Sequence, residues 1–207
     1  MIITYYGNHY LKVSQGDTVL SINPPSKDSK RKEKTPRFGA SIVLCSNHHV
    51  DYAGLDQNNY GDQVPLVIDG PGDYESKEIL IKGIGTKTVL ENKEYINTTY
   101  SLLVEGVSIC VLGPLSETLK ASEKGQIGSA EILFVSLRED TLSPQELHKL
   151  AVSFEPNIII PVDYTEKTLS VFLKEAGNTA PETVDKLTLK KKDIYSKQAE
   201  IILINQE

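Results

Sequence analysis

The stretch "ASIVLCSNHHVDYAG", residues 40–54, joins an apolar run to two adjacent histidines and an aspartate. The run at residues 40–46 is apolar at nearly every position, which is typical of a strand that is covered on both faces. Histidine and aspartate side chains after such a strand are of the kinds that bind a metal ion. The flanking Asn47 and Tyr52 are poor ligands. The stretch is therefore a metal site, the remains of one, or a loop that carries histidine.

The composition favours one globular domain over residues 1–207. Of these residues 39% are hydrophobic and 24% are charged, so a sizeable core can be buried. A net charge of −6 argues against nucleic acid as the main partner. No apolar run reaches the ~18 residues of a membrane span, so we expect no membrane partner. Cys45 and Cys110 lie in apolar runs, which favours a reducing compartment and predicts a cytoplasmic protein.

The first half of the chain is rich in short strand signals. Segments with β-branched and aromatic residues, separated by turn residues, predict strands at residues 1–6, 10–14, 18–22, 40–46, 65–69, 78–84, 98–104 and 107–113. Residues 23–39 are polar and contain three prolines, which predicts a loop. The basic cluster in this loop, Lys30 to Lys34, is typical of a solvated surface rather than of a binding arm.

The second half alternates strands with helices. Ser143-Pro144-Gln145-Glu146 is a capping box with proline at the first helical position, and apolar residues follow at helical spacing up to Phe154. A second amphipathic pattern runs from Leu169 to Ala176 and is stopped by Gly177. Further strands are predicted at residues 130–136, 156–162, 185–193 and 199–205. This order predicts an α/β (α+β) fold of two packed sheets flanked by helices.

Six motifs in a fixed order point to a known family. They are "MIITYYGNHYLKV", "LSINPPS", "ASIVLCSNHHVDYAG", "VIDGPGDYE", "GVSICVLGPL" and "EPNIIIPVDY". With these motifs the chain resembles the metallo-β-lactamase superfamily, specifically its small bacterial branch of candidate zinc-dependent hydrolases. The resemblance implies a four-layer αββα sandwich, with metal ligands on loops at one edge of the two sheets.

The resemblance also assigns positions to the family's metal ligands, and this chain departs from most of them. The family holds a metal pair with His-x-His-x-Asp-His, a later His, a bridging Asp and a final His. The matching positions here are, in that order, Asn47, His49, Asp51, Tyr52, Val111, Pro114 and Asp163. Two ligands are therefore kept, and the final histidine is replaced by an aspartate.

The chemistry of the substituted positions predicts a degenerate site without a zinc pair. Val111 and Pro114 offer no donor atom. Asn47 offers a neutral amide oxygen, which is a weak ligand for zinc. Tyr52 would have to lose a proton with a pKa of about 10 before it could bind a metal well.

Two functions of different classes remain open. The first is a non-catalytic protein that kept the scaffold, needs no cofactor, and binds a small molecule or a protein. The second is a hydrolase of an ester, amide or phosphodiester that uses one weakly bound divalent ion, held by His49, Asp51 and Asp163. Without a metal, the two carboxylates would repel, so one would hold a proton or recruit a cationic partner. The oligomeric state stays open.

Three histidines outside the assigned positions have simpler interpretations. His48 matches a variable position of the motif and is predicted to lie at the surface. His9 lies in a strand turn, where an ordinary hydrogen bond is expected, and His148 lies on the polar face of a predicted helix, where exposure to solvent is expected. The sequence Gly70-Pro71-Gly72 is interpreted as a structural turn, because an isolated glycine motif is a weak signal for phosphate binding.

Overall fold

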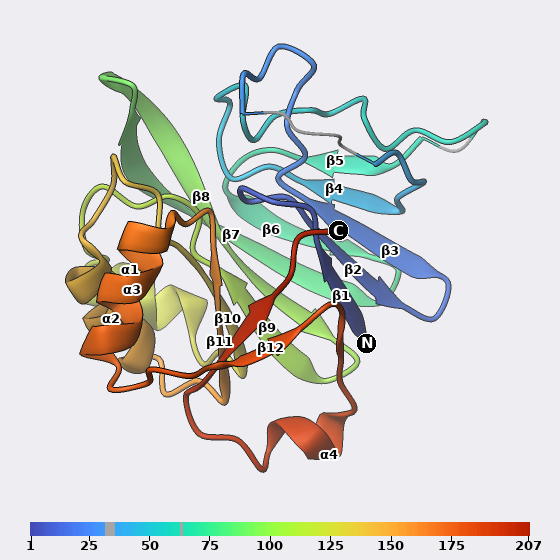
Figure 1. Ribbon diagram of the computed structural model, residues 1–207. Coiled ribbons are helices and arrows are strands. Elements are labelled where there is room, and N and C mark those ends of the chain that lie inside the picture. Colours follow the sequence, from blue (N-terminus) through green and yellow to red (C-terminus); the bar gives the residue numbers. More distant parts are fainter. Residues whose placement is uncertain (32–35, 63) are drawn as a thin grey trace.

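The computed structural model describes residues 1–31, 36–62 and 64–207, and arranges them in two packed β-sheets (Figure 1). Residues 32–34 of the predicted basic cluster therefore lie outside the described residues. The predicted mixed α/β class with two sheets is confirmed. None of the helices in the described ranges has the length and apolar character that crossing a membrane requires.

The first sheet has six strands in the order β13-β1-β2-β3-β4-β5. Its strands are β1 (Ile2–Tyr5), β2 (Leu11–Gln15), β3 (Thr18–Ile22), β4 (Ile42–Leu44), β5 (Leu66–Ile68) and β13 (Leu187–Thr188). β3 pairs with β4 in parallel, so the carboxyl ends of both strands lie at one edge of the sheet. The loops that follow these two strands therefore meet, and the Ser26 amide donates a hydrogen bond to the Val50 carbonyl across 2.8 Å.

The second sheet has eight strands in the order β12-β14-β11-β10-β9-β8-β7-β6. Its strands are β6 (Gly72–Ser76), β7 (Ile79–Leu90), β8 (Lys93–Val104), β9 (Val107–Val111), β10 (Ile132–Ser136), β11 (Ile158–Val162), β12 (Glu182–Val184) and β14 (Glu200–Ile204). The predicted hairpin at Glu105-Gly106 joins β8 to β9. β7 and β8 are longer than predicted, because their pairing continues to a turn at Glu91-Asn92.

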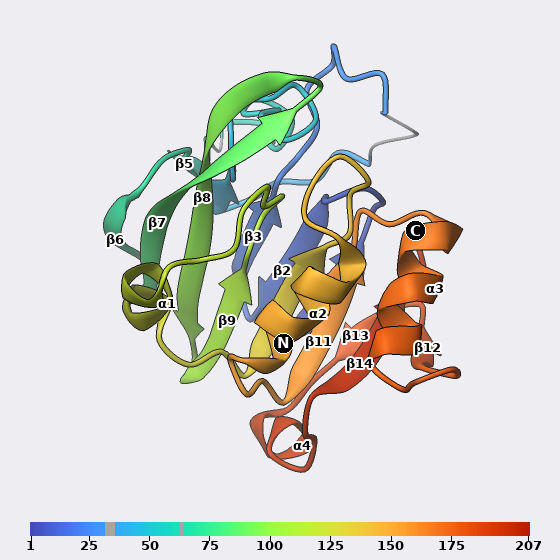
Figure 2. The same ribbon diagram turned by 90° about the vertical axis from the view of Figure 1, so that its left-hand side faces the viewer.

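Three helices lie on the outer face of the eight-stranded sheet (Figure 2), namely α1 (Ala121–Ile127), α2 (Pro144–Val152) and α3 (Glu166–Glu175). The short α4 (Lys191–Ile194) lies apart from them, and its Ile194 packs into the core between the sheets. The capping box before α2 is confirmed, since the Ser143 side chain accepts a hydrogen bond from the Glu146 amide. The strand predicted at residues 185–193 is wrong beyond Thr188, because the lysine-rich end of that segment has no apolar alternation and forms α4 instead.

The two sheets enclose an apolar core that fixes the position of the loops at their edge. Ile22, Leu44, Val111, Phe134 and Val162 are all fully buried in this core. The Tyr100 hydroxyl adds a polar link between the sheets, because it donates hydrogen bonds to the carbonyls of Cys45 (2.9 Å) and Ile68 (3.1 Å). The outer face of the six-stranded sheet is covered by turns, in which Phe38 and Leu55 pack against a small cluster of Ala40, Val43 and Cys45.

Candidate functional site

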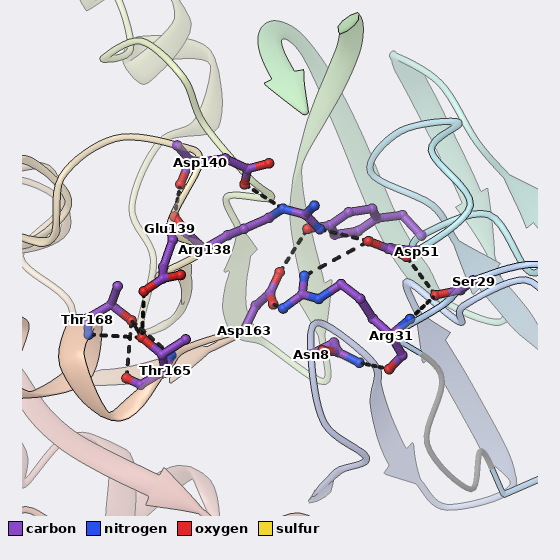
Figure 3. Close-up of polar contacts among 12 residues, drawn as sticks. Asn8, Ser29, Arg31, Asp51, Arg138, Glu139, Asp140, Asp163, Thr165 and Thr168 are labelled. Atoms are coloured by element: carbon purple, nitrogen blue, oxygen red, sulfur yellow. Dashed lines mark hydrogen bonds and ion pairs between the residues drawn. The ribbon is translucent and has the colours of Figure 1, made fainter. Parts of the chain in front are cut away.

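Four loops bring charged side chains together at one edge of the two sheets (Figure 3). Arg31 comes from the loop after β3 and Asp51 from the loop after β4, so both belong to the six-stranded sheet. Arg138 follows β10 and Asp163 follows β11, so both belong to the eight-stranded sheet. The charged groups of these four residues point toward one another and form a cluster of two arginines and two aspartates.

Asp51 is held from two sides. Its Oδ2 accepts a hydrogen bond from Arg138 Nη1 at 2.8 Å, and its Oδ1 accepts one from the Ser29 hydroxyl at 2.6 Å. Burial of the side chain raises the pKa of the Asp51 carboxyl, but the hydrogen bonds from Arg138 and Ser29 and the charge of Arg138 outweigh it and lower the pKa below its usual value. Asp51 is therefore ionised at neutral pH.

Asp163 is bound by three groups in an uncommon backbone conformation. Its Oδ1 accepts a hydrogen bond from Arg31 Nη2 at 2.6 Å, and its Oδ2 accepts one from the Tyr52 hydroxyl at 2.9 Å. Its backbone N–H donates to the Tyr5 hydroxyl at 3.1 Å. The backbone of Asp163 has a φ of +54°, in the left-handed region that few residues other than glycine adopt. Two of these contacts hold the carboxylate, and the contact with Tyr5 holds the backbone in this conformation.

The two arginines differ in how deeply they are buried. The Arg138 side chain is only 7% exposed, and its Nε also donates to Asp140 Oδ1 at 2.6 Å. The Arg31 side chain is 35% exposed, and its backbone carbonyl accepts a hydrogen bond from Asn8 Nδ2 at 2.8 Å. Burial lowers the pKa of the Arg138 guanidinium. The neighbouring Tyr52, Asp140 and Asp51 raise it by more, so the pKa lies above its usual value and this group stays charged.

His49 and Asn47 accept hydrogen bonds from backbone amides of their own turn, with atoms that could otherwise bind a metal ion. His49 Nδ1 accepts a hydrogen bond from the Asp51 amide at 3.2 Å, and Asn47 Oδ1 accepts one from the His49 amide at 2.9 Å. His49 Nε2 lies 3.8 Å from a carboxylate oxygen of Glu91, which is at the tip of the β7–β8 hairpin. The His49 ring packs edge-on against Tyr95 of the same hairpin. These contacts make the turn rigid and leave few lone pairs free.

The remaining assigned positions are packed rather than polar. Val111 ends β9, is fully buried in the core between the sheets, and pairs with Tyr100 and Phe134. Pro114 is also buried. Tyr52 is 1% exposed, and burial together with the charge of Asp163 raises the pKa of its hydroxyl well above the usual value, so it keeps its proton and acts as a donor.

A zinc pair does not fit these residues. The oxygens of Asp51 and Asp163 accept hydrogen bonds from the two arginines, Ser29 and Tyr52. Within the described ranges, no group of three or more histidine, cysteine, aspartate and glutamate side chains converges on a common point. His49 contacts Asp51 and Tyr52, and Tyr52 contacts Asp163, but the nearest charged partners of the two aspartates are arginines.

Sequence reasoning missed both arginines and Ser29. Arg31 was assigned to a solvated basic cluster, which is wrong for this residue, because its guanidinium pairs with Asp163 and Asp51. A signal for Arg138 exists in the chain, since it lies two residues after the buried parallel strand β10, and Asp163 directly follows the neighbouring strand β11. Side chains that follow neighbouring parallel strands emerge at the same edge of a sheet. We expect one of the two carboxylates to hold a proton or recruit a cationic partner. The sequence contains two candidates for that partner, Arg31 and Arg138.

Two of the predicted histidine environments are wrong. His9 is 1% exposed, and among the described residues neither of its ring nitrogens has a hydrogen-bond partner. Its ring packs edge-on against Tyr52, and burial lowers the pKa of His9 from 6.5 to about 4. His148 is half-buried against Phe172 rather than exposed. The prediction for His48 is confirmed, because its side chain is exposed.

The protein should lose stability between pH 6.5 and pH 4 because His9 is buried in its neutral form. The unfolded chain binds a proton at His9 near pH 6.5, whereas the folded chain binds it only near pH 4. The folded state therefore binds fewer protons in this window, and stability present above pH 6.5 is lost as the pH falls. We expect a loss of about 3 kcal/mol from this group, at roughly 1.4 kcal/mol for each pKa unit.

Urea unfolding at pH 7 and pH 4.5 measures this loss in the parent and in His9→Phe. Phenylalanine fills the same space without a titratable group, so the variant should be at least as stable as the parent at pH 7 and should lose less stability on acidification. His148→Gln is the matched comparison, because burial also lowers the pKa of His148 but this ring is only half-buried. If His9→Phe loses as much stability between pH 7 and pH 4.5 as the parent does, then His9 is not the source of the pH dependence.

Beside the cluster lies a small polar cleft of about 330 Å³. It is lined by Arg31, Glu91, Arg138, Glu139, Asp140, Asp163 and Thr165. The Thr165 hydroxyl donates to Glu139 at 3.2 Å, and the Glu91 amide donates to Asp140 at 3.3 Å, so neighbouring loops are tied together around the opening. A cleft with this lining suits a small polar ligand rather than an apolar one.

Comparison with known proteins identifies the family. The family described as "Beta-lactamase superfamily domain" matches residues 2–163 of this chain. No protein with a curated description matches it.

Several solved structures share the fold. A metallo-beta-lactamase superfamily protein from Thermotoga maritima, described as a candidate Zn-dependent hydrolase, is 22% identical, with 98% of this chain and 97% of that chain covered and a TM-score of 0.75. The metallo-beta-lactamase fold protein YhfI from Bacillus subtilis is 10% identical, with coverage of 99% and 96% and a TM-score of 0.62. An isothiocyanate hydrolase from Delia radicum gut bacteria is 9% identical, with coverage of 100% and 97% and a TM-score of 0.63. At these identities the likeness shows the fold alone.

Proposed function

Because this chain belongs to the beta-lactamase superfamily, we propose that it keeps the scaffold of that family as a non-catalytic binding protein that works without a zinc pair. The observation that carries the proposal is that both carboxylates at the assigned positions, the retained Asp51 and the substituted Asp163, are paired with guanidinium groups at 2.8 and 2.6 Å. The negative charge of a carboxylate in such a pair is already balanced, and a metal ion would have to compete with the guanidinium for its lone pairs.

The packing of the other assigned positions supports the same conclusion. Val111 and Pro114 are buried and have no side-chain atom that could bind a metal ion. The Tyr52 hydroxyl donates its hydrogen bond to Asp163. Replacing these side chains by ligands would need a histidine and an aspartate where the core is now apolar. The scaffold therefore favours packing and hydrogen bonding at the places where the family pattern has metal ligands.

The proposed role is to bind a small polar molecule in the 330 Å³ cleft, or a protein chain that covers the cleft. The charged lining of the cleft supports a polar ligand. We also propose a cytoplasmic location, which the two free and buried thiols of Cys45 and Cys110 support.

The alternative is a hydrolase that uses one weakly held ion. The residues it would need are His49, Asp51 and Asp163, and the structure pairs the two aspartates with Arg138 and Arg31 instead. An ion could enter only if it displaced at least one guanidinium. This competition makes metal content the decisive measurement.

Protein purified without chelator and then incubated with zinc or manganese should contain far less than one metal ion per chain after desalting. Elemental analysis by mass spectrometry measures this content, and assays with an ester, a lactam and a phosphodiester measure turnover with and without EDTA. We expect turnover no faster than that of a heat-denatured sample. A stoichiometric metal ion together with EDTA-sensitive turnover would contradict the proposal and favour the hydrolase.

A further inference from the structure

The negative charges of two buried carboxylates at one edge of the fold need positive charges beside them. The side chains of Asp51 and Asp163 are 4% and 0% exposed, and both lie within reach of the same guanidinium group, Arg31. Arg31 Nη2 is 2.6 Å from Asp163, and Arg31 Nη1 is 4.0 Å from Asp51. Without this guanidinium and that of Arg138, both carboxylates would be buried as uncompensated charges.

We infer that Arg31 and Arg138 are built-in replacements for the metal pair, two fixed cations that balance the charges of Asp51 and Asp163 and hold both side chains in place. The numbers match, because two guanidinium groups face two carboxylates and both aspartates occupy positions that the family pattern gives to ligands. This goes beyond the proposed function, because it assigns an electrostatic role to the two arginines rather than a ligand to the cleft.

The two ion pairs also cross between the sheets. Arg138 follows β10 of the eight-stranded sheet and binds Asp51, which follows β4 of the six-stranded sheet. Arg31 follows β3 of the six-stranded sheet and binds Asp163, which follows β11 of the eight-stranded sheet. Each pair therefore joins one loop of each sheet, as a metal ion with ligands from both sides would do. The pairs form a latch at the open edge of the sandwich (Figure 3).

Burial separates this latch from ordinary surface ion pairs. Lys87 and Glu94 form a pair at 3.7 Å whose side chains are 67% and 68% exposed. Such exposed pairs contribute little to stability, because water and salt screen them. The pair between Arg138 and Asp51 is screened far less, since its side chains are 7% and 4% exposed. Removing one partner of a buried pair leaves an uncompensated charge and is strongly destabilising.

Double-mutant cycles with thermal unfolding test the latch. Arg138→Met should lower the Tm by about 6–15 °C, and Asp51→Asn together with Arg138→Met should lower it by clearly less than the sum of the single changes. Arg31→Met with Asp163→Asn should show the same sign with a smaller effect, because Arg31 is partly exposed. Lys87→Met, the matched control, should change the Tm by less than about 3 °C.

Addition of a divalent cation tests whether the two guanidinium groups take the place of metal ions or only form structural ion pairs. Without both guanidinium groups, in Arg31→Met/Arg138→Met, millimolar manganese should recover part of the lost Tm, while the parent should not respond. The same variant with Asp51→Asn and Asp163→Asn should not respond either. If the double arginine variant does not fold, the single variants give the same comparison.

The inference would be overturned if the Tm changes of the single variants simply added in the double variants. It would also be overturned if they did not add but manganese recovered none of the lost Tm. Neither outcome depends on whether the parent hydrolyses a substrate, so failure of the latch and failure of the proposed function can be told apart.

Discussion

Zinc affinity should rise by at least about 100-fold when the family's ligand pattern is restored and the two guanidinium groups are removed, since even outer-shell partners change metal affinity by roughly 10–100-fold. The variant carries Arg31→Ala, Asn47→His, Tyr52→His, Val111→His, Pro114→Asp, Arg138→Ala and Asp163→His. Isothermal titration with zinc, after circular dichroism has shown that the variant is folded, measures the gain.

The matched control carries the five ligand substitutions and keeps both arginines. It should bind zinc more weakly than the full variant, because Arg138 remains 2.8 Å from Asp51 and competes for its carboxylate. Val111→His is the most demanding change, since this position is fully buried between Tyr100 and Phe134. A folded full variant with no gain in zinc affinity would show that the assignment of the positions is wrong.

Gly54→Ala should lower the free energy of unfolding by about 2–4 kcal/mol, because the loops after β3 and β4 leave no room for a side chain at this position. A Cβ at Gly54 would lie 2.3 Å from the carbonyl oxygen of Pro25, which is a backbone atom and cannot swing aside. The Gly54 amide also donates a hydrogen bond to the Pro24 carbonyl at 2.7 Å. Relief of the clash would push away the loop that carries Ser29 and Arg31.

Urea unfolding of Gly54→Ala and of Gly70→Ala tests this packing. Gly70 is the control, because a Cβ there meets no atom within 4 Å. We expect Gly70→Ala to change stability by no more than ~0.5 kcal/mol. Equal stabilities of the two variants would contradict the close approach of the two loops.

The fold could be predicted from the sequence because its signals are local and agree with one another. The capping box at Ser143 and the apolar run at residues 40–46 each specify an element without reference to the rest of the chain. The elements that were missed carry weak local signals. α1 contains a glycine and buries only Ile127, and α4 has four residues and buries only Ile194, so neither shows an apolar stripe in the sequence.

The site was predicted only in part, because charge pairing over long sequence distances leaves no local pattern. The sequence indicated that one of Asp51 and Asp163 would hold a proton or recruit a cationic partner. It could not identify that partner, because Arg31 lies 132 residues from Asp163 and Arg138 lies 87 residues from Asp51. Only the parallel strand order shows that these residues emerge at one edge. His9 was misjudged for a related reason, since its burial comes from Tyr52 of another loop.

A crystal structure of the parent protein grown with zinc and manganese, with diffraction data collected at both absorption edges, tests the central claim most directly. We predict ordered density for Arg31 against Asp163 and for Arg138 against Asp51, with no anomalous peak among His49, Asp51 and Asp163. An anomalous peak at that point, with either guanidinium displaced from its carboxylate, would contradict the account.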